Sequence, residues 1–288
     1  MTPIAQWVEV GKRYGPLVAV EDVSLALRPG EVTALVGHNG AGKTTLIKLL
    51  LGLIRPSVGR VEVQGQNPAG RGGAQARRTL GFLPENVAFH GAMTAVELMA
   101  FYARLKGCAP AGNADLLARV GLAAAARRRV ATYSKGMRQR LGIAQALIGD
   151  PKLIIVDEPT AGLDPGERNR FYNLLSEIGE NVIVILSTHI VEDVKELCSN
   201  MAIINGGRVL YAGSPEAALL QLEGKIWEKS ITKAQIDDYQ SRFRVISSKL
   251  VAGKPIIHIL SDGDPGDGFR RAEAGLEDVF FAKIDAGA

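Results

Sequence analysis

A glycine-rich segment with one lysine and two threonines has the residue types and the spacing of a phosphate-binding loop. Gly37 to Thr44 reads GHNGAGKT, which fits the pattern GxxxxGK[ST]. Glycines let backbone N–H groups approach phosphates, the lysine neutralises β- and γ-phosphate oxygens, and the threonine hydroxyl is a ligand for Mg²⁺. A tight turn without a ligand is the alternative interpretation. The segment predicts a bound nucleoside triphosphate, contacted by Gly37, His38, Asn39, Gly40, Ala41, Gly42, Lys43, Thr44 and Thr45.

Two adjacent carboxylates follow an apolar run and suit Mg²⁺ binding and water activation. The run LIIVDEPT places Asp157 and Glu158 at the carboxyl end of an expected buried strand, where open α/β sheets present their ligand crevice. One carboxylate can hold Mg²⁺ while its neighbour, on the other face of the strand, polarises a water against the γ-phosphate. A solvated strand end is the alternative. With the phosphate loop upstream, we interpret Asp157 as a metal ligand and Glu158 as a catalytic residue.

A histidine closes a second apolar run. His189 follows VIVILST, and a lone histidine after a strand can also be a structural residue. A crevice that holds a triphosphate needs a hydrogen-bonding group near the γ-phosphate. We therefore assign His189 a catalytic role, conditional on the other motifs.

The elements that carry these residues predict an α/β fold. Continuous apolar runs such as LIIV and VIVIL are typical of parallel strands buried on both faces. A strand, a glycine loop and a helix over residues 43–53 follow one another in the order that nucleotide-binding α/β folds use. Residues 67–75, with three Gly and a Pro, predict a loop. Early strands are expected at residues 7–10, 20–27, 32–36 and 60–63.

The remaining patterns divide the chain. Helical spacing at residues 94–105, 113–120 and 136–148 predicts a helical subdomain over about residues 86–150. We expect one α/β domain over residues 1–220. Residues 221–288, which include an expected strand at 255–260 and the amphipathic ending GLEDVFFAKI, predict a small α+β region.

Composition excludes several classes of protein. The chain has 288 residues and a net charge of +4, which is too small to make nucleic-acid binding the default expectation. Cys108 and Cys198 form neither a disulfide framework nor a metal-binding pattern. The most apolar runs are much shorter than the roughly 20 residues of a membrane-spanning helix, and the N-terminus lacks the apolar core of a secretion signal. We expect a protein that stays in the cytoplasm.

Further motifs resemble those of the ABC ATPases. Tyr133 to Arg140 reads YSKGMRQR, similar to the LSGGQ-type signature in the form associated with exporters of the ABC-2 class. Across residues 1–220 the other motifs follow the order of that family. They are the adenine-stacking aromatic residue, the Q-loop region, the D-loop and the switch histidine, at Tyr14, Gly81 to Glu85, Ala161 to Asp164, and His189.

The resemblance implies a fold and a composite site. The implied fold is a P-loop NTPase of the ABC ATPase type, with a mixed sheet core, an antiparallel β subdomain, the inserted helical subdomain and the C-terminal extension. Two such subunits dimerise head to tail on ATP and Mg²⁺, so the signature of one subunit meets the nucleotide of the other. The residues assigned to that contact are Ser134, Lys135, Gly136, Met137 and Asp164.

Two positions depart from the usual family pattern. Glu85 stands where the Q-loop has Gln, so the resemblance implies that a carboxylate contacts Mg²⁺ and the attacking water. Lys135 and Met137 replace Gly and Gln of LSGGQ. Both changes occur in the exporter-like subset. For Tyr14, a core or surface tyrosine is the alternative to an adenine platform.

The sequence also resembles a narrower group, the ATPase subunits of transporters that mature nitrous oxide reductase. The resemblance lies in the segments GHNGAGKTT, GFLPENV, TYSKGMRQRLGIAQAL and GLEDVF. Other ABC-2 ATPases, for polysaccharides, lipids or drugs, share much of the sequence of these segments. It implies an integral-membrane permease, a homodimer at the cytoplasmic face of the inner membrane, and in this group a periplasmic accessory protein. A soluble ABC ATPase acting on nucleic acid is the rival. We expect no specific nucleic-acid partner.

Overall fold

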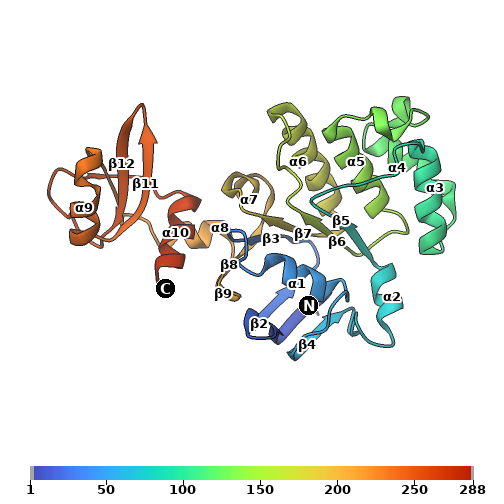
Figure 1. Ribbon diagram of the computed structural model, residues 1–288, viewed down its shortest axis with the longest axis horizontal. Helices are drawn as coiled ribbons and strands as arrows, with labels where there is room; N and C mark the ends of the chain where they lie inside the picture. Colours follow the sequence, from blue (N-terminus) through green and yellow to red (C-terminus); the bar gives the residue numbers. More distant parts are fainter. Residues whose placement is uncertain (1–2, 287–288) are drawn as a thin grey trace. The chain divides into compact units, whose positions relative to one another are not determined.

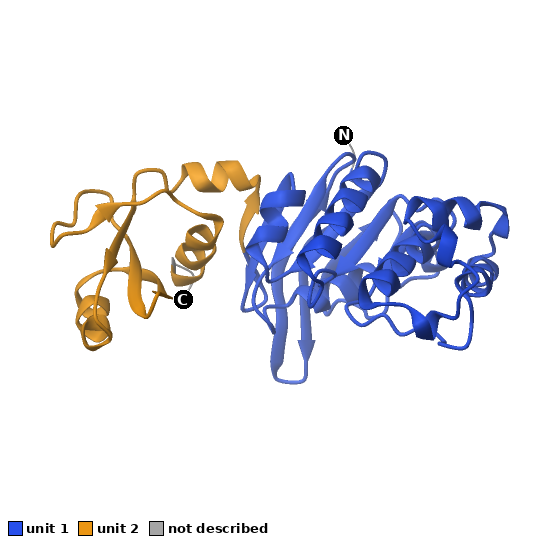
Figure 2. Ribbon diagram, turned by 90° about the horizontal axis from the view of Figure 1, so that it is seen from above, with its two compact units in different colours: residues 1–209 blue, residues 210–288 orange. Residues whose placement is uncertain are grey.

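The computed structural model describes residues 3–286 and divides into two compact units, Met1–Val209 and Leu210–Ala288 (Figure 2). The predicted domain boundary lies near residue 220, and the assignment of domains stays a prediction. No helix among residues 3–286 is long and apolar enough to span a membrane.

A six-stranded sheet forms the centre of the first unit (Figure 1). Its order is β5-β6-β7-β3-β8-β9, and the pairs from β5 to β8 are parallel. β6 and β7 are almost entirely buried, as expected from continuous apolar runs between two covering layers. The strands are β3 Val32–Val36, β5 Leu80–Leu83, β6 Leu153–Asp157, β7 Ile183–Thr188, β8 Asn200–Asn205 and β9 Arg208–Gly213.

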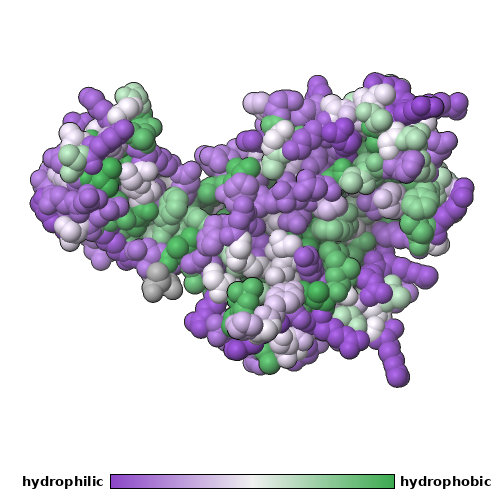
Figure 3. Space-filling model, viewed as in Figure 1, coloured by the Kyte–Doolittle hydropathy of each residue, from purple (hydrophilic) through white to green (hydrophobic). Residues whose placement is uncertain are grey.

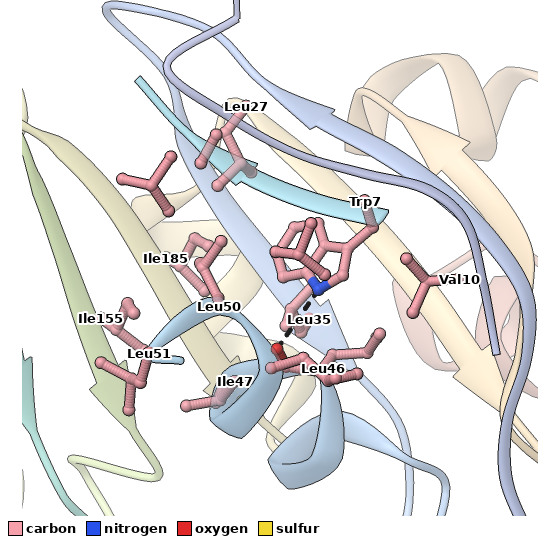
Figure 4. Packing of buried hydrophobic residues seen from close by; sticks show 14 of the residues in the cluster. Trp7, Val10, Leu27, Leu35, Leu46, Ile47, Leu50, Leu51, Ile155 and Ile185 are labelled. Atoms are coloured by element: carbon pink, nitrogen blue, oxygen red, sulfur yellow. Dashed lines mark hydrogen bonds between the residues drawn. The ribbon is translucent and has the colours of Figure 1, made fainter. Parts of the chain in front are cut away.

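A three-stranded antiparallel sheet packs beside the first helix. It contains β1 (Ala5–Tyr14), β2 (Leu17–Leu27) and β4 (Val58–Val63) in the order β2-β1-β4. β1 and β2 are longer than the expected strands because they continue into a hairpin that turns at Gly15. Trp7 is buried against α1 (Lys43–Leu50), and its indole N–H donates to the carbonyl oxygen of Leu46 at 3.3 Å (Figure 4).

Helix α1 ends three residues before the expected position. Gly52 has a φ of +68°, its N–H donates to Leu49 O, and the N–H of Leu53 donates to Lys48 O. These bonds form a Schellman motif, in which a left-handed glycine ends the helix. The prediction of a loop at residues 67–75 is also partly wrong, because α2 (Gly73–Arg78) begins inside this range.

Three helices follow β5 and form the inserted helical region. They are α3 (Ala95–Lys106), α4 (Asn113–Arg119) and α5 (Lys135–Ala146). Thr94 and Glu97 form a reciprocal capping box that fixes the start of α3. The later helices of this unit are α6 (Pro165–Gly179) and α7 (Val191–Leu197).

The second unit has its own sheet and core. Four strands form a sheet in the order β11-β12-β10-β13, and the core cluster of this unit includes Trp227, Tyr239 and Phe269. The expected strand at residues 255–260 and the amphipathic ending correspond to β12 and α10. The elements are α8 Pro215–Leu220, β10 Ile226–Ser230, α9 Ile236–Arg242, β11 Val245–Val251, β12 Lys254–Leu260, β13 Arg270–Arg271 and α10 Leu276–Ala286.

Candidate active site

The glycine loop joins the end of β3 to the start of α1. Gly42 has a φ of +114°, and a Cβ added there would lie 2.9 Å from the carbonyl oxygen of Ala19, so a side chain at this position is strained and crowded. No side chain caps the start of α1, and its first turn holds no acidic residue. The first N–H groups of the helix are therefore left for an anion, which fits a phosphate ligand.

Lys43 is buried beneath this loop. Its ammonium group donates to the carbonyl oxygen of Gly37 and, at 3.4 Å, to that of His38. The same Nζ lies 3.3 Å from Oε1 of Glu158. This distance is that of an ion pair, but Oε1 makes no hydrogen bond although it is buried. The loop lysine and the carboxylate predicted to be catalytic thus face each other.

Glu158 also contacts the predicted switch histidine. Its Oε2 lies 2.7 Å from Nδ1 of His189, whose side chain is half exposed. The backbone of Glu158 has a φ of +46°, a conformation that costs a residue with a side chain about 1–2 kcal/mol. Such strain concentrates at functional sites. The structure brings Lys43, Glu158 and His189 into one cluster.

Asp157 is positioned differently from its neighbour. Its carboxylate accepts a hydrogen bond from the hydroxyl of Ser187 on the adjacent strand β7. Thr44, the other predicted metal ligand from the loop, is exposed at the start of α1. Carboxylate and hydroxyl oxygens are donors that suit Mg²⁺, so the donor set of Thr44 and Asp157 fits this ion.

A cavity of about 320 Å³ lies over the loop. It brings together most of the residues predicted to bind nucleotide and metal, and three residues that the sequence did not single out, Leu17, Val18 and Ala19, complete its wall. The predicted residues that line it are Tyr14, His38, Asn39, Gly40, Ala41, Gly42, Lys43, Thr44, Thr45, Glu85, Asp157 and Glu158.

Two side chains of the cavity wall have few contacts of their own. Tyr14 is 45% exposed at the end of β1, and its ring lies 5.0 Å from the ammonium of Lys12. Glu85 is exposed just beyond β5. An exposed aromatic face at the rim of a phosphate site is available for a nucleotide base, which gives Tyr14 a physical basis for its predicted role.

The predicted signature residues do not line this cavity. Ser134 caps α5, and its hydroxyl accepts from the N–H of Met137 at 3.1 Å. Lys135 donates to the carbonyl oxygen of Ala161. A Cβ at Gly136 would lie 2.4 Å from Oε2 of Glu167. The signature is thus packed against the segment that leads into α6.

Asp164 caps that helix. Its Oδ1 accepts from the N–H of Glu167 at 2.9 Å, and Pro165 follows as the first helical residue. Asp164 does not line the cavity either. Within one chain, the residues predicted to contact nucleotide therefore fall into two separate groups.

Comparison with known proteins identifies the family. Residues 20–161 match the ABC transporter family. The chain is 33% identical to the uncharacterized ABC transporter ATP-binding protein YxlF of Bacillus subtilis, across 96% of this chain and 97% of that protein. The chain belongs to the ABC transporter ATP-binding proteins. It is also 37% identical to the Nod factor export ATP-binding protein I of Cupriavidus metallidurans, across 75% of this chain and 72% of that protein.

A solved ABC structure agrees with this assignment. The chain is similar to cbiO1 from Clostridium perfringens, part of the ABC transporter complex cbiONQ, with a TM-score of 0.71 and 28% identity. The match covers 77% of this chain and 92% of that one. The predicted ABC ATPase fold is confirmed. As an ABC ATP-binding subunit, the protein binds ATP with Mg²⁺ and couples ATP hydrolysis to transport.

One buried network in this ABC protein was not foreseen from the sequence. Asp193 in α7 accepts hydrogen bonds from the hydroxyl groups of Thr160, Tyr172 and Thr188. Burial raises the pKa of Tyr172 well above its ordinary value, and the bond to Asp193 raises it further. The segment VEDVKEL carries no motif that marks the central residue. Only the tertiary structure brings these groups together.

Proposed function

We propose that Glu158 is the catalytic carboxylate of an ATP-hydrolysing transporter subunit and that His189 holds it in place. The observation that carries the proposal is the position of one carboxylate between the loop lysine, at 3.3 Å, and the histidine, at 2.7 Å. A carboxylate with one buried oxygen free of hydrogen bonds is able to accept one from a water molecule. Its role is to orient that water toward the γ-phosphate.

The other cavity residues bind and orient the nucleotide. Lys43 compensates phosphate charge, the N–H groups at the start of α1 bind phosphate oxygens, and Tyr14 stacks on the base. Thr44 and Asp157 would hold Mg²⁺, with Glu85 as a further oxygen ligand. When bound, the ion neutralises charge that develops on the β- and γ-phosphates.

A second copy of the chain completes the site in this proposal. Ser134, Lys135, Gly136, Met137 and Asp164 of one subunit contact the nucleotide of the other. The support is that these residues stay outside the cavity that holds the phosphate loop, while the start of α5 offers N–H groups to an anion. ATP then joins the two subunits, and hydrolysis separates them.

The proposed membrane partner is an integral-membrane permease that docks beside β5. A groove of about 350 Å³ is lined mainly by apolar residues of the turn after α1 and of β5, and Arg77, Lys106 and Gln145 complete it. Leu53 is 64% exposed at this groove. Hydrophobic residues gather near α1 and β5 on the face shown in Figure 3. Because Glu85 lies two residues after the end of β5 and lines the nucleotide cavity, docking here places the permease next to that cavity.

We further propose an exporter of the ABC-2 type, and within it a role in the copper-site maturation of nitrous oxide reductase with a periplasmic accessory protein. The similarity to a Nod factor export protein supports the exporter class. The narrower role depends on the sequence resemblance of the segments GHNGAGKTT, GFLPENV and GLEDVF to that group. Deleting the gene and measuring the copper content of nitrous oxide reductase tests it. Fully loaded copper centres in the deletion strain would exclude this role and leave the exporter class.

Glu158→Gln tests the proposed chemistry. We expect ATP binding to persist, turnover to fall about 100-fold or more, and an ATP-bound dimer to accumulate in gel filtration. Wild-type turnover would show that Glu158 is not the catalytic carboxylate.

Leu53→Asp tests the groove as the docking site of the permease. We expect basal ATPase activity to remain and stimulation by the permease to be lost. Unchanged stimulation would move the docking site elsewhere.

A further inference from the structure

Asp193 lies at the centre of a fully buried hydrogen-bond network. Its side chain has no exposed surface. Oδ2 accepts from Thr188 Oγ1 at 2.6 Å and from Thr160 Oγ1 at 2.9 Å, while Tyr172 OH donates to Oδ1. Three hydroxyl groups from three separate segments thus meet on one carboxylate.

Burying this carboxylate is unfavourable unless its oxygens are well bonded. Within residues 3–286, no lysine, arginine or histidine forms an ion pair with Asp193. Its hydrogen bonds to hydroxyl groups therefore offset the loss of hydration without help from a cation. A buried acid without a cation is a costly way to fill a core position, which indicates a purpose other than packing.

Two of the hydroxyl groups that donate to Asp193 belong to residues close in sequence to Glu158 and His189. Thr160 follows Glu158 by two residues, and Thr188 directly precedes His189. The hydroxyl of Thr188 also accepts the N–H of Ile190 at 2.9 Å, which fixes the backbone just after the histidine. Through these two hydroxyl groups, Asp193 connects the two segments that present Glu158 and His189.

Neither member of the pair is held well by its own segment. Glu158 has a left-handed backbone that its sequence does not favour, and His189 is half exposed with Glu158 as its hydrogen-bond partner. Beyond its N–H bond to Ser187 O at 2.9 Å, the position of Glu158 depends on what restrains the chain around it. The bond from Thr160 to Asp193 supplies such a restraint.

We propose that Asp193 is a positioning residue for ATP hydrolysis, because its carboxylate fixes the segment after Glu158 against the segment before His189. This inference rests on the proposed role of Glu158. It assigns no contact between Asp193 and nucleotide, because Asp193 does not line the nucleotide cavity. Loss of the network should therefore lower the rate of the bound complex and spare the affinity for ATP.

The experiment compares Asp193→Asn, Thr160→Val and Thr188→Val in the full chain. Asparagine keeps the shape but replaces an acceptor oxygen by a donor, and valine removes one hydroxyl. We expect kcat to fall about 10- to 100-fold for each, the loss typical of a misplaced catalytic group, with KM and ATP affinity unchanged. In the absence of nucleotide, hydrogen exchange should be faster over residues 187–190 than in the wild type.

Thr33→Val is the matched control. Thr33 is a buried threonine in β3 whose hydroxyl has no hydrogen-bond partner, so the same substitution should leave kcat and exchange unchanged. Wild-type kcat in all three network variants, or an equal loss in Thr33→Val, would overturn the inference. Glu158→Gln, measured beside them, separates the two proposals: if that variant alone loses turnover, only the role of Asp193 fails, and if it turns over normally, the proposed function fails.

Discussion

His189 Nδ1 lies 2.7 Å from Glu158 Oε2, although thirty-one positions separate the two residues in the chain. The contact follows from the parallel pairing of β6 and β7, whose carboxyl ends present Asp157 and Thr188 at neighbouring positions. Glu158 and His189 are the next residues along their strands. Strand register therefore holds the imidazole of His189 beside a carboxylate that lines the phosphate cavity.

His189→Ala should lower ATP turnover about 100-fold through loss of this contact, because Glu158 would then be free to turn away from the water it orients. ATP affinity should stay within about twofold, since the phosphate contacts come from the loop and α1. Steady-state ATPase measurements and nucleotide titration check both. His90→Ala, at an exposed histidine of the same chain, is the control. Equal turnover in both variants would contradict the role of His189.

Lys43→Met should weaken nucleotide binding about tenfold or more, because the buried ammonium that compensates phosphate charge is lost. The same change leaves Glu158 without its cation in the nucleotide-free protein. Removing one partner of a buried ion pair lowers the free energy of unfolding, by about 3 kcal/mol or less where solvent reaches the other partner. We expect Glu158→Gln to recover part of this loss in the double variant. A double-mutant cycle on thermal unfolding measures the coupling, and additive effects would argue against the ion pair.

Glu85→Gln tests the departure from the usual Q-loop residue. The side chain lines the nucleotide cavity two residues after the end of β5. If its charge contributes to the metal and water site, turnover should change roughly fivefold, which corresponds to about 1 kcal/mol in the activation free energy. Basal ATPase activity and its stimulation by the permease are the two measurements. Glu85 has no part in catalysis or coupling if both are untouched.

The second unit should respond to pH through His258. Its Nδ1 lies 2.8 Å from Oδ1 of Asp278 in α10, and this hydrogen bond raises the pKa of His258 above its ordinary value of 6.5. Burial raises the pKa of Asp278, but hydrogen bonds from His258 and from the N–H of Gly275 lower it overall. The histidine contribution to stability is complete below pH 6.5 and is lost as pH rises through its folded pKa. The aspartate contribution is lost only as pH falls below 3.8.

Hydrogen exchange of the β12 and α10 segments is the measurement for this pair. Exchange should be slower at about pH 6 than at about pH 8.5 after correction for the intrinsic rate. His258→Asn should remove the difference by removing the titrating group. A variant that keeps the wild-type pH dependence would show that another group controls this helix.

The sequence predicted the phosphate loop, the acidic strand end and the parallel strands because each depends on residues close together in the chain. The predicted helix is too long at its end because the apolar residues continue to Leu53, whereas the left-handed backbone of Gly52 ends the helix. The contacts of Asp193, and the bond from Lys135 to Ala161, join segments far apart in sequence. Local patterns carry no information on such pairings, which only the packed elements determine.

The left-handed backbone of Glu158 sets a limit for protein engineering. Glycine or asparagine adopts a φ of +46° with less strain than glutamate does, so a design that optimises thermal stability alone would replace this residue. Either replacement removes the carboxylate that faces Lys43 and His189. Stability and turnover therefore make opposite demands on one position, and thermostabilised variants of this chain should keep residue 158 fixed.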